Sequence, residues 1–324
     1  MANSGGGIES VKETGDTNLS GDDEFVLANL FENWEQFSEA GSVLAPISPL
    51  AMNLLNLDRD SSTPGRDLTG IVESDPVLTA RVLGLANSVF FAASTKPIFK
   101  ISEAVTRLGV DTILTAAFSQ MTAQWLRGTF KRSDRALIHG LWLEYLITAH
   151  CSREIARRLP SGEVDIALAY AAGLLHDLGT IALLCVQPEP MSRFVRSGYG
   201  VGTPLHASFV TAHTRLGEGL LKSWRAPADI ATVAGRHHSR SMLSQPAVSV
   251  IVVLADHLHM AVLDHDSAEF VNPEGCRPGC FGAATEFVSA GLAALGIADD
   301  LDSMVGRVAA ESRSIEMLGT VVHL

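Results

Sequence analysis

The chain has 324 residues, enough for one large domain or two modest ones. Its net charge of -12 at pH 7 argues against broad binding to the phosphates of nucleic acid, although a local basic pocket is compatible with it. Hydrophobic residues make up 47% of the chain and aromatic residues only 6%, a mixture that favours packed helices over a sheet. We therefore expect an all-α fold.

The first 23 residues are mostly small or polar and have little to bury, so we expect a disordered tail over 1–23. Apolar residues at helical spacing then predict an amphipathic helix over 24–40. A helix start is clear at Ser74-Asp75-Pro76, because Asp75 suits the cap and Pro76 the first helical position. The helices expected after the first are 50–57, 66–72, 76–86, 102–109 and 111–126.

A charged stretch from Lys131 to Arg135 interrupts the helical pattern, and we place a domain boundary there. The expected parts are one helical subdomain over 24–131, a second over 132–263, and a loop with closing helices over 264–324. Short helices with short connections predict a helical bundle of two packed subdomains. The helices expected beyond the boundary are 133–159, 163–175, 188–196, 204–224, 227–238, 246–263, 283–295 and 301–318, with a loop at 264–282.

The amino-terminal residues contain no basic stretch followed by an apolar one, so we expect no signal peptide and a cytoplasmic location. Residues 166–186 approach the length of a membrane span, but Asp177 at the middle disfavours insertion by about 2.5–3.5 kcal/mol. We therefore expect a buried segment and no membrane partner. Cys151 and Cys185 are expected in the core, and the pair Cys276 and Cys280 is too small a set to predict structural zinc.

The stretch Gly173-Leu174-Leu175-His176-Asp177-Leu178-Gly179 lies inside this apolar run. A buried carboxylate without a partner costs several kcal/mol or stays protonated. Asp177 therefore needs a cation, and His176 beside it is a common metal ligand.

Other polar side chains interrupt apolar helical faces in the same way. One such histidine is more often a core residue than a ligand, and Asp256 alone would be explained by an arginine partner. Seven together predict a site of nitrogen and oxygen ligands, suited to two divalent ions that share a carboxylate. The candidate ligands are His139, His176, Asp177, His213, His237, His238 and Asp256.

In this order the seven residues resemble the HD superfamily of metal-dependent phosphohydrolases, most of all the two-metal arrangement of its HD-GYP branch. The resemblance implies two ions of Fe, Mn, Ni or Zn bridged by Asp177, with Asp177 and His176 as the catalytic pair and a water activated by both ions attacking phosphorus. One ion would be completed by His139, His176 and Asp256, and the other by His213, His237 and His238.

The first half is similar to the HDOD domain, the HD-related output domain. The similarity is carried by residues 49–55, 71–88, 101–105 and 108–109, with 73–88 the most specific part, and it covers about 44–263. Proteins of this family are bacterial signalling proteins. The resemblance thus implies an output module that meets a signalling protein or a nucleotide second messenger.

Two departures from the HD-GYP pattern weigh against cleavage of cyclic di-GMP. Thr180 stands where the motif has a lysine, and no Gly-Tyr-Pro follows His238. Candidates to replace the missing cation are Arg215, Lys222 and Arg236.

Three hypotheses follow from these patterns. In the first, the chain is a signalling output protein with a two-ion site in its HD-like half. In the second, it is an active metal-dependent phosphodiesterase or phosphohydrolase that acts on a nucleotide or cyclic nucleotide. In the third, the histidines form a structural hydrogen-bond network with Asp177 and Asp256, without metal or turnover.

Overall fold

The computed structural model describes residues 19–38, 44, 64–87, 97–126, 135–160, 163–239, 245–265, 280–297 and 301–310. Within these ranges every regular element is a helix, which confirms the all-α prediction. The elements are α1 Gly21–Glu32, the 3-10 helix η1 Trp34–Phe37, α3 Pro64–Glu73, α4 Pro76–Ala86, α5 Ile101–Leu126, α6 Arg135–Ala156, α7 Ile166–Leu175, α8 Leu178–Val186, α9 Pro188–Arg196, α10 Pro204–Ser223, α11 Ala228–Arg236, α12 Ala247–His265 and α13 Cys280–Ala294, followed by helical residues 301–310.

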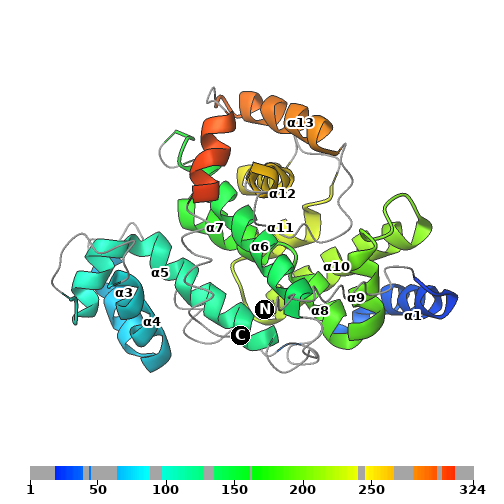
Figure 1. Ribbon diagram of the computed structural model, residues 1–324, viewed down its shortest axis with the longest axis horizontal. Helices are drawn as coiled ribbons and strands as arrows, with labels where there is room; N and C mark the ends of the chain where they lie inside the picture. The colour runs from blue at the N-terminus through cyan, green and yellow to red at the C-terminus, as the bar shows by residue number, and fades with distance from the viewer. Residues whose placement is uncertain are drawn as a thin grey trace, which may run out of the picture.

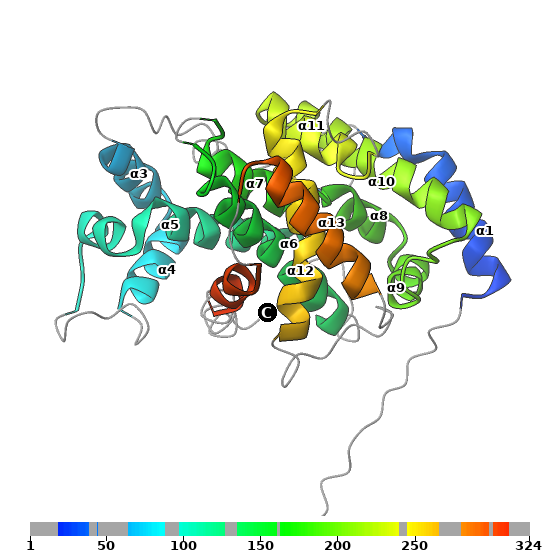
Figure 2. The ribbon, with the colours of Figure 1, turned by 90° about the horizontal axis from the view of Figure 1, so that it is seen from above.

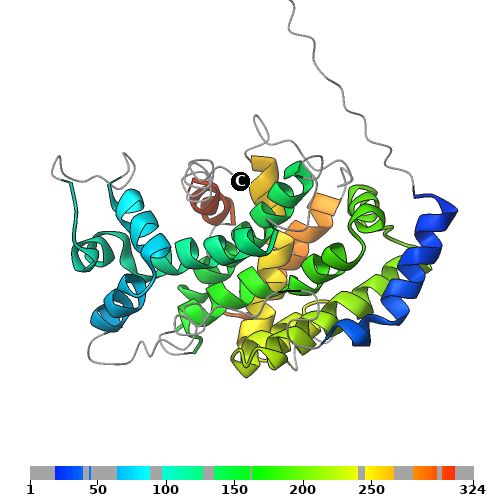
Figure 3. The same ribbon diagram turned by 90° about the horizontal axis from the view of Figure 1, so that it is seen from below.

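The centre of the molecule is built on α6, which packs against α7 on one side and α12 on another. Helix α10 packs against α8 and α11, and α1 lies across α9 and α10. The group of α3, α4 and the first part of α5 lies at one end of the molecule, with α1 at the other (Figures 1 and 2). Figure 3 shows the side on which α10 and α11 run beside the central helices.

Two local signals act as the sequence predicts. The backbone N–H of Leu78 donates to the Asp75 carboxylate at 3.0 Å, so Asp75 caps α4. Gly109 has φ 77 and ψ 162, a conformation that L side chains rarely adopt, and it kinks the long α5. The predicted helix end at Leu108-Gly109 is therefore a break within one element.

The predicted end of the amino-terminal tail is wrong. The tail was expected to last to residue 23, but α1 begins at Gly21 and buries Asp23. The Asp23 carboxylate accepts two hydrogen bonds from the Arg193 guanidinium of α9, at 2.6 and 3.0 Å. A sequence pattern predicts that a charged residue such as Asp23 is exposed, because its partner Arg193 lies 170 residues away and cannot be recognised from the local sequence. The helix expected over 24–40 also divides at Asn33 into α1 and η1.

Other expectations are narrowed or left as predictions. Helix α12 continues to His265 and α13 begins at Cys280, so the loop predicted over 264–282 is too wide at both ends. The helix predicted over 50–57 and Cys276 lie outside the described residues. The division at 131 also stays a prediction, because 127–134 are not described.

The apolar run 166–186 is two helices, α7 and α8, which meet at His176-Asp177. In the described chain this run alone has the length and composition of a membrane span, and 83% of its most apolar window is buried inside the fold. Such burial favours a core segment, in line with the sequence. Cys151 is also buried, and Cys185 half-buried.

Candidate metal centre

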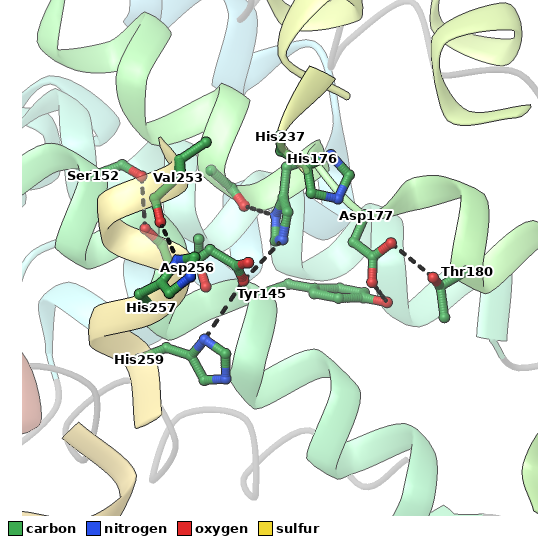
Figure 4. Close-up of polar contacts among 12 residues, drawn as sticks. Tyr145, Ser152, His176, Asp177, Thr180, His237, Val253, Asp256, His257 and His259 are labelled. Carbon is green, nitrogen blue, oxygen red and sulfur yellow. Dashed lines mark hydrogen bonds and ion pairs between the residues drawn. The ribbon is translucent and has the colours of Figure 1, made fainter. Parts of the chain in front are cut away.

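The His-Asp pair lies in the turn between α7 and α8. Asp177 occupies the cap position of α8, yet its carboxylate accepts no hydrogen bond from the helix N–H groups. Instead it accepts one from the Thr180 hydroxyl at 2.7 Å and one from the Tyr145 hydroxyl of α6 at 3.3 Å (Figure 4). The carboxylate is thus held by hydroxyl groups of α8 and α6.

A glycine allows α8 to approach α10 at this point. A Cβ at Gly179 would lie 1.8 Å from the His213 carbonyl oxygen, far inside contact distance. With glycine in place, the His213 Nε2 lies 3.6 Å from the Asp177 Oδ1. Gly179 is therefore required by the approach of the two helices.

Three histidines of the site are fixed in one orientation by backbone carbonyls. The Nδ1 atoms of His176, His213 and His237 lie 2.7, 2.8 and 2.9 Å from the carbonyl oxygens of Gly173, Phe209 and Ala234. Because a carbonyl oxygen only accepts, each Nδ1 carries the proton. In the neutral ring the Nε2 lone pair then points into the site, as in histidines that ligate metal.

The Nε2 atoms of His213 and His237 form no ordinary hydrogen bond with each other when both rings are neutral, whereas a protonated His176 donates from Nε2 to Asp256. His213 Nε2 lies 3.3 Å from His237 Nε2, and His176 Nε2 lies 3.3 Å from Asp256 Oδ1. Two ligands on one ion with bonds of about 2.0–2.1 Å in tetrahedral geometry stand about 3.3 Å apart. The spacing of both pairs therefore fits a shared divalent cation.

The two halves of the site differ in the direction in which the pKa values of their histidines are shifted. Burial opposes a charged ring at His176, but the Asp256 carboxylate outweighs it and raises the pKa of His176 to about 9. Burial likewise disfavours ionised Asp256, but His176 and His259 hold its pKa well below the usual value. At His213 and His237 burial prevails and lowers the pKa well below the usual value. Burial also raises the pKa of Asp177 to about 7.

The third histidine of the α10–α11 half lies at the solvent edge. His213, His237 and His238 offer ligand atoms that all lie within 4.8 Å of one another, with the first two buried and His238 exposed. The His238 ring centroid lies 4.3 Å from that of His237 and 5.0 Å from that of His213. His238 thus gives this half of the site one solvent-exposed, open side.

Six of the seven candidate ligands come together around this point. His176 and His237 link the two halves, with ring centroids 5.0 Å apart. The side chain of His139 lies outside the described part of the structure, although its backbone belongs to α6. The residues brought together are His176, Asp177, His213, His237, His238 and Asp256.

Sequence reasoning missed several residues of the site. Tyr145 was not among the candidates, and Thr180 was considered only as the residue that stands in place of a lysine. Glu144 on α6 is electrostatically coupled to His176, Asp256 and His259, and burial raises its pKa. His259 lies three residues after Asp256 on α12, a spacing that places both on one helix face.

The expected replacement cations lie elsewhere. Arg215 and Lys222 both pair with Glu218 on the outer face of α10, at 3.3 and 2.7 Å, with side chains 58% and 63% exposed. Arg236 is exposed at the end of α11. In the described structure none of these three pairs with one of the six candidate ligands whose side chains are placed.

Comparison with known proteins identifies the family. The sequence model of the HDOD domain matches residues 44–240. A solved HDOD domain protein of unknown function from Geobacter sulfurreducens is 22% identical, with a TM-score of 0.58, covering 90% of this chain and 98% of that one. A protein of Marinobacter aquaeolei VT8, assigned provisionally to signal transduction, is 19% identical with a TM-score of 0.64, covering 95% of this chain and 68% of that one.

A provisionally assigned phosphohydrolase of Shewanella amazonensis SB2B is 19% identical, with a TM-score of 0.55, covering 94% of this chain and 99% of that one. At such identities these structures show the shared fold. An uncharacterized protein of Treponema pallidum (strain Nichols) is 24% identical over 200 residues. The match spans 60% of this chain and only 38% of that protein.

Proposed function

The chain belongs to the HDOD domain family, and we propose that it is a cytoplasmic signal-transduction output protein whose HD-like half holds divalent metal. The observation that carries this proposal is the facing pair of Nε2 atoms of His213 and His237, 3.3 Å apart. Both rings keep their proton on Nδ1, so two lone pairs face each other in a buried place. A cation between them removes the repulsion and uses both lone pairs.

We propose two ions, because the donor atoms fall into two sets. One set, the His213 set, contains the imidazoles of His213, His237 and His238. The other, the His176 set, contains the imidazole of His176 and the carboxylate of Asp256. Asp177 lies beside the first set and is available to bridge both, since each carboxylate oxygen can accept more than one contact. Imidazole and carboxylate together suit Fe, Mn, Ni or Zn.

The residues around the donors support this role. Thr180 and Tyr145 orient Asp177, and three backbone carbonyls orient the rings, as outer partners of metal ligands do. Divalent ions held there supply Lewis-acid chemistry to an oxygen-containing ligand. The exposed edge at His238 is the side from which a signalling nucleotide or protein partner would be sensed.

Metal-dependent phosphohydrolysis is the second candidate function. It is supported by the open side of the His213 set and by the likeness to a solved protein provisionally assigned as a metal-dependent phosphohydrolase, with a TM-score of 0.51. One observation against phosphohydrolysis is that Thr180, which stands where the motif has a lysine, supplies no positive charge. The candidates Arg215 and Lys222 pair with Glu218. We therefore favour the regulatory module.

The two functions are separated by measuring turnover of phosphodiester and nucleotide substrates by fully metal-loaded protein. The module predicts metal without turnover. Turnover that vanishes in His176→Ala while metal stays in the His213 set would replace it by the enzyme. A protein that takes up no divalent metal would contradict both and leave the histidine network as a structural feature.

A further inference from the structure

A histidine outside the seven candidate ligands faces the metal centre. His259 lies one helical turn after Asp256 on α12, with its side chain 14% exposed and its Nδ1 3.5 Å from the Asp256 Oδ1 (Figure 4). The Nδ1 atom is buried and makes no hydrogen bond of ordinary geometry in the described structure. Its polar contact is therefore the candidate ligand itself.

This orientation differs from that of two other histidines on the long helices. His213 and His257 each direct Nδ1 to the carbonyl oxygen four residues earlier, at 2.8 Å. A helical histidine has that carbonyl always at hand, so the departure of His259 toward a carboxylate calls for a reason. The same Asp256 oxygen lies 3.3 Å from His176 Nε2, so it is flanked by two imidazoles.

The two imidazoles have different tasks at that oxygen. His176 holds its Nδ1 proton on the Gly173 carbonyl and turns Nε2, the atom that could ligate metal once deprotonated, toward Asp256. His259 turns its Nδ1 toward the same oxygen at 3.5 Å, and because a carboxylate oxygen only accepts, this contact favours a proton on that nitrogen. One ring thus offers a ligand atom beside Asp256, and the other lies where it can orient the carboxylate.

We propose that His259 is a positioning residue of the metal centre, which orients Asp256 through its Nδ1–H and so raises the affinity of the His176 set for divalent metal. The inference rests on the proposed metal site and adds a residue that the ligand pattern lacks. Loss of an outer partner of this kind lowers metal affinity by about 10- to 100-fold.

The chain offers a matched control on the same helix. His257 is exposed, its Nδ1 is engaged with the Val253 carbonyl of its own helix, and its ring lies 4.6 Å from that of Phe287. It is two residues from His259 and, among the described contacts, forms no hydrogen bond or ion pair with a candidate ligand. His257→Ala removes the same chemical group from α12 and leaves the described hydrogen bonds and ion pairs of the centre in place.

The experiment titrates metal-free full-length protein with Mn²⁺ and Zn²⁺ against a competing chelator, for wild type and for His259→Ala, His259→Asn and His257→Ala. An asparagine amide reaches about the place of Nδ1 and keeps a donor. We expect His259→Ala to weaken metal binding by the His176 set by at least about 10-fold. His259→Asn should recover most of that affinity, and His257→Ala should match wild type. Circular dichroism of the metal-free wild type and of the three variants checks that all four proteins are folded.

Each other outcome is decisive. Unchanged affinity in His259→Ala, with metal bound by wild type, overturns the positioning role and leaves the metal site standing. Equal loss in the alanine and asparagine variants also overturns it, because a donor alone would then not suffice. Absence of metal from the wild type itself would refute the proposed function, a result that the wild-type titration gives separately.

Discussion

Replacing Gly179 by alanine tests how closely α8 must approach α10. The new Cβ would stand 1.8 Å from the His213 carbonyl oxygen and 2.6 Å from its carbon, both backbone atoms that no rotamer change removes. Real Cβ contacts are essentially never under 3.0 Å, so the helices must separate by at least 1.2 Å. Overpacking of this kind costs about 3 kcal/mol.

The same movement would separate Asp177 from His213, whose atoms lie 3.6 Å apart. Metal sites tolerate distance changes of only about 0.2 Å. We therefore expect Gly179→Ala to lower the unfolding temperature by at least about 5 °C and to abolish tight metal binding in the His213 set.

Gly140→Ala in α6 is the control, because a Cβ there meets nothing within 4 Å. In a helix interior this change is neutral or stabilises by about 0.4–1 kcal/mol. Calorimetry and metal titration of both variants measure the effect. A Gly179→Ala protein with the stability and metal affinity of wild type would refute the close approach and the glycine requirement derived from it.

Three further predictions concern single side chains. Because the pKa of His176 is raised from 6.5 to about 9, this residue should stabilise the metal-free protein by about 3 kcal/mol below pH 6.5, and the stabilisation should be lost as the pH rises through 9. Saturating metal should remove this decline. Chemical denaturation across the pH range measures it, and a flat profile for the metal-free protein would show that the idea is wrong. Asp23→Asn should cost about 2 kcal/mol by weakening the Arg193 pair, whereas Asp22→Asn, at an exposed neighbour, should change little; equal urea midpoints for both would contradict the buried pair. Thr180→Val should weaken metal binding several-fold because Asp177 loses its 2.7 Å hydrogen bond, and Thr180→Ser should restore it, so a valine variant that binds as wild type would exclude this role.

Patterns local in the sequence predicted the fold well. The Asp75 cap and the break at Gly109 depend on residues within one or two turns, and periodicity gave helix bounds such as Pro188–Arg196 as the structure has them. The predicted end of the tail at residue 23 was wrong because the burial of Asp23 depends on Arg193, far along the chain.

The site was predictable where a residue type is costly to bury without a partner. The His-Asp pair and the histidines of α10 and α11 stood out for that reason. Tyr145 and His259 did not, because a tyrosine or histidine on a helix face has no unusual spacing, and only the packing of α6 and α12 shows what it contacts. The metal-ligand roles of His139 and of the six residues that come together stay predictions.

The central claim is that imidazoles and carboxylates meet here to hold divalent metal, and its most direct test is the metal content of the purified full-length protein. Elemental analysis after loading with Fe, Mn, Ni or Zn and desalting should give about two ions per chain, falling to about one or less in the double variant His213→Ala/His237→Ala. Wild-type protein that retains fewer than about one ion per chain under every loading condition, or a double variant that retains as many as wild type, would contradict the account.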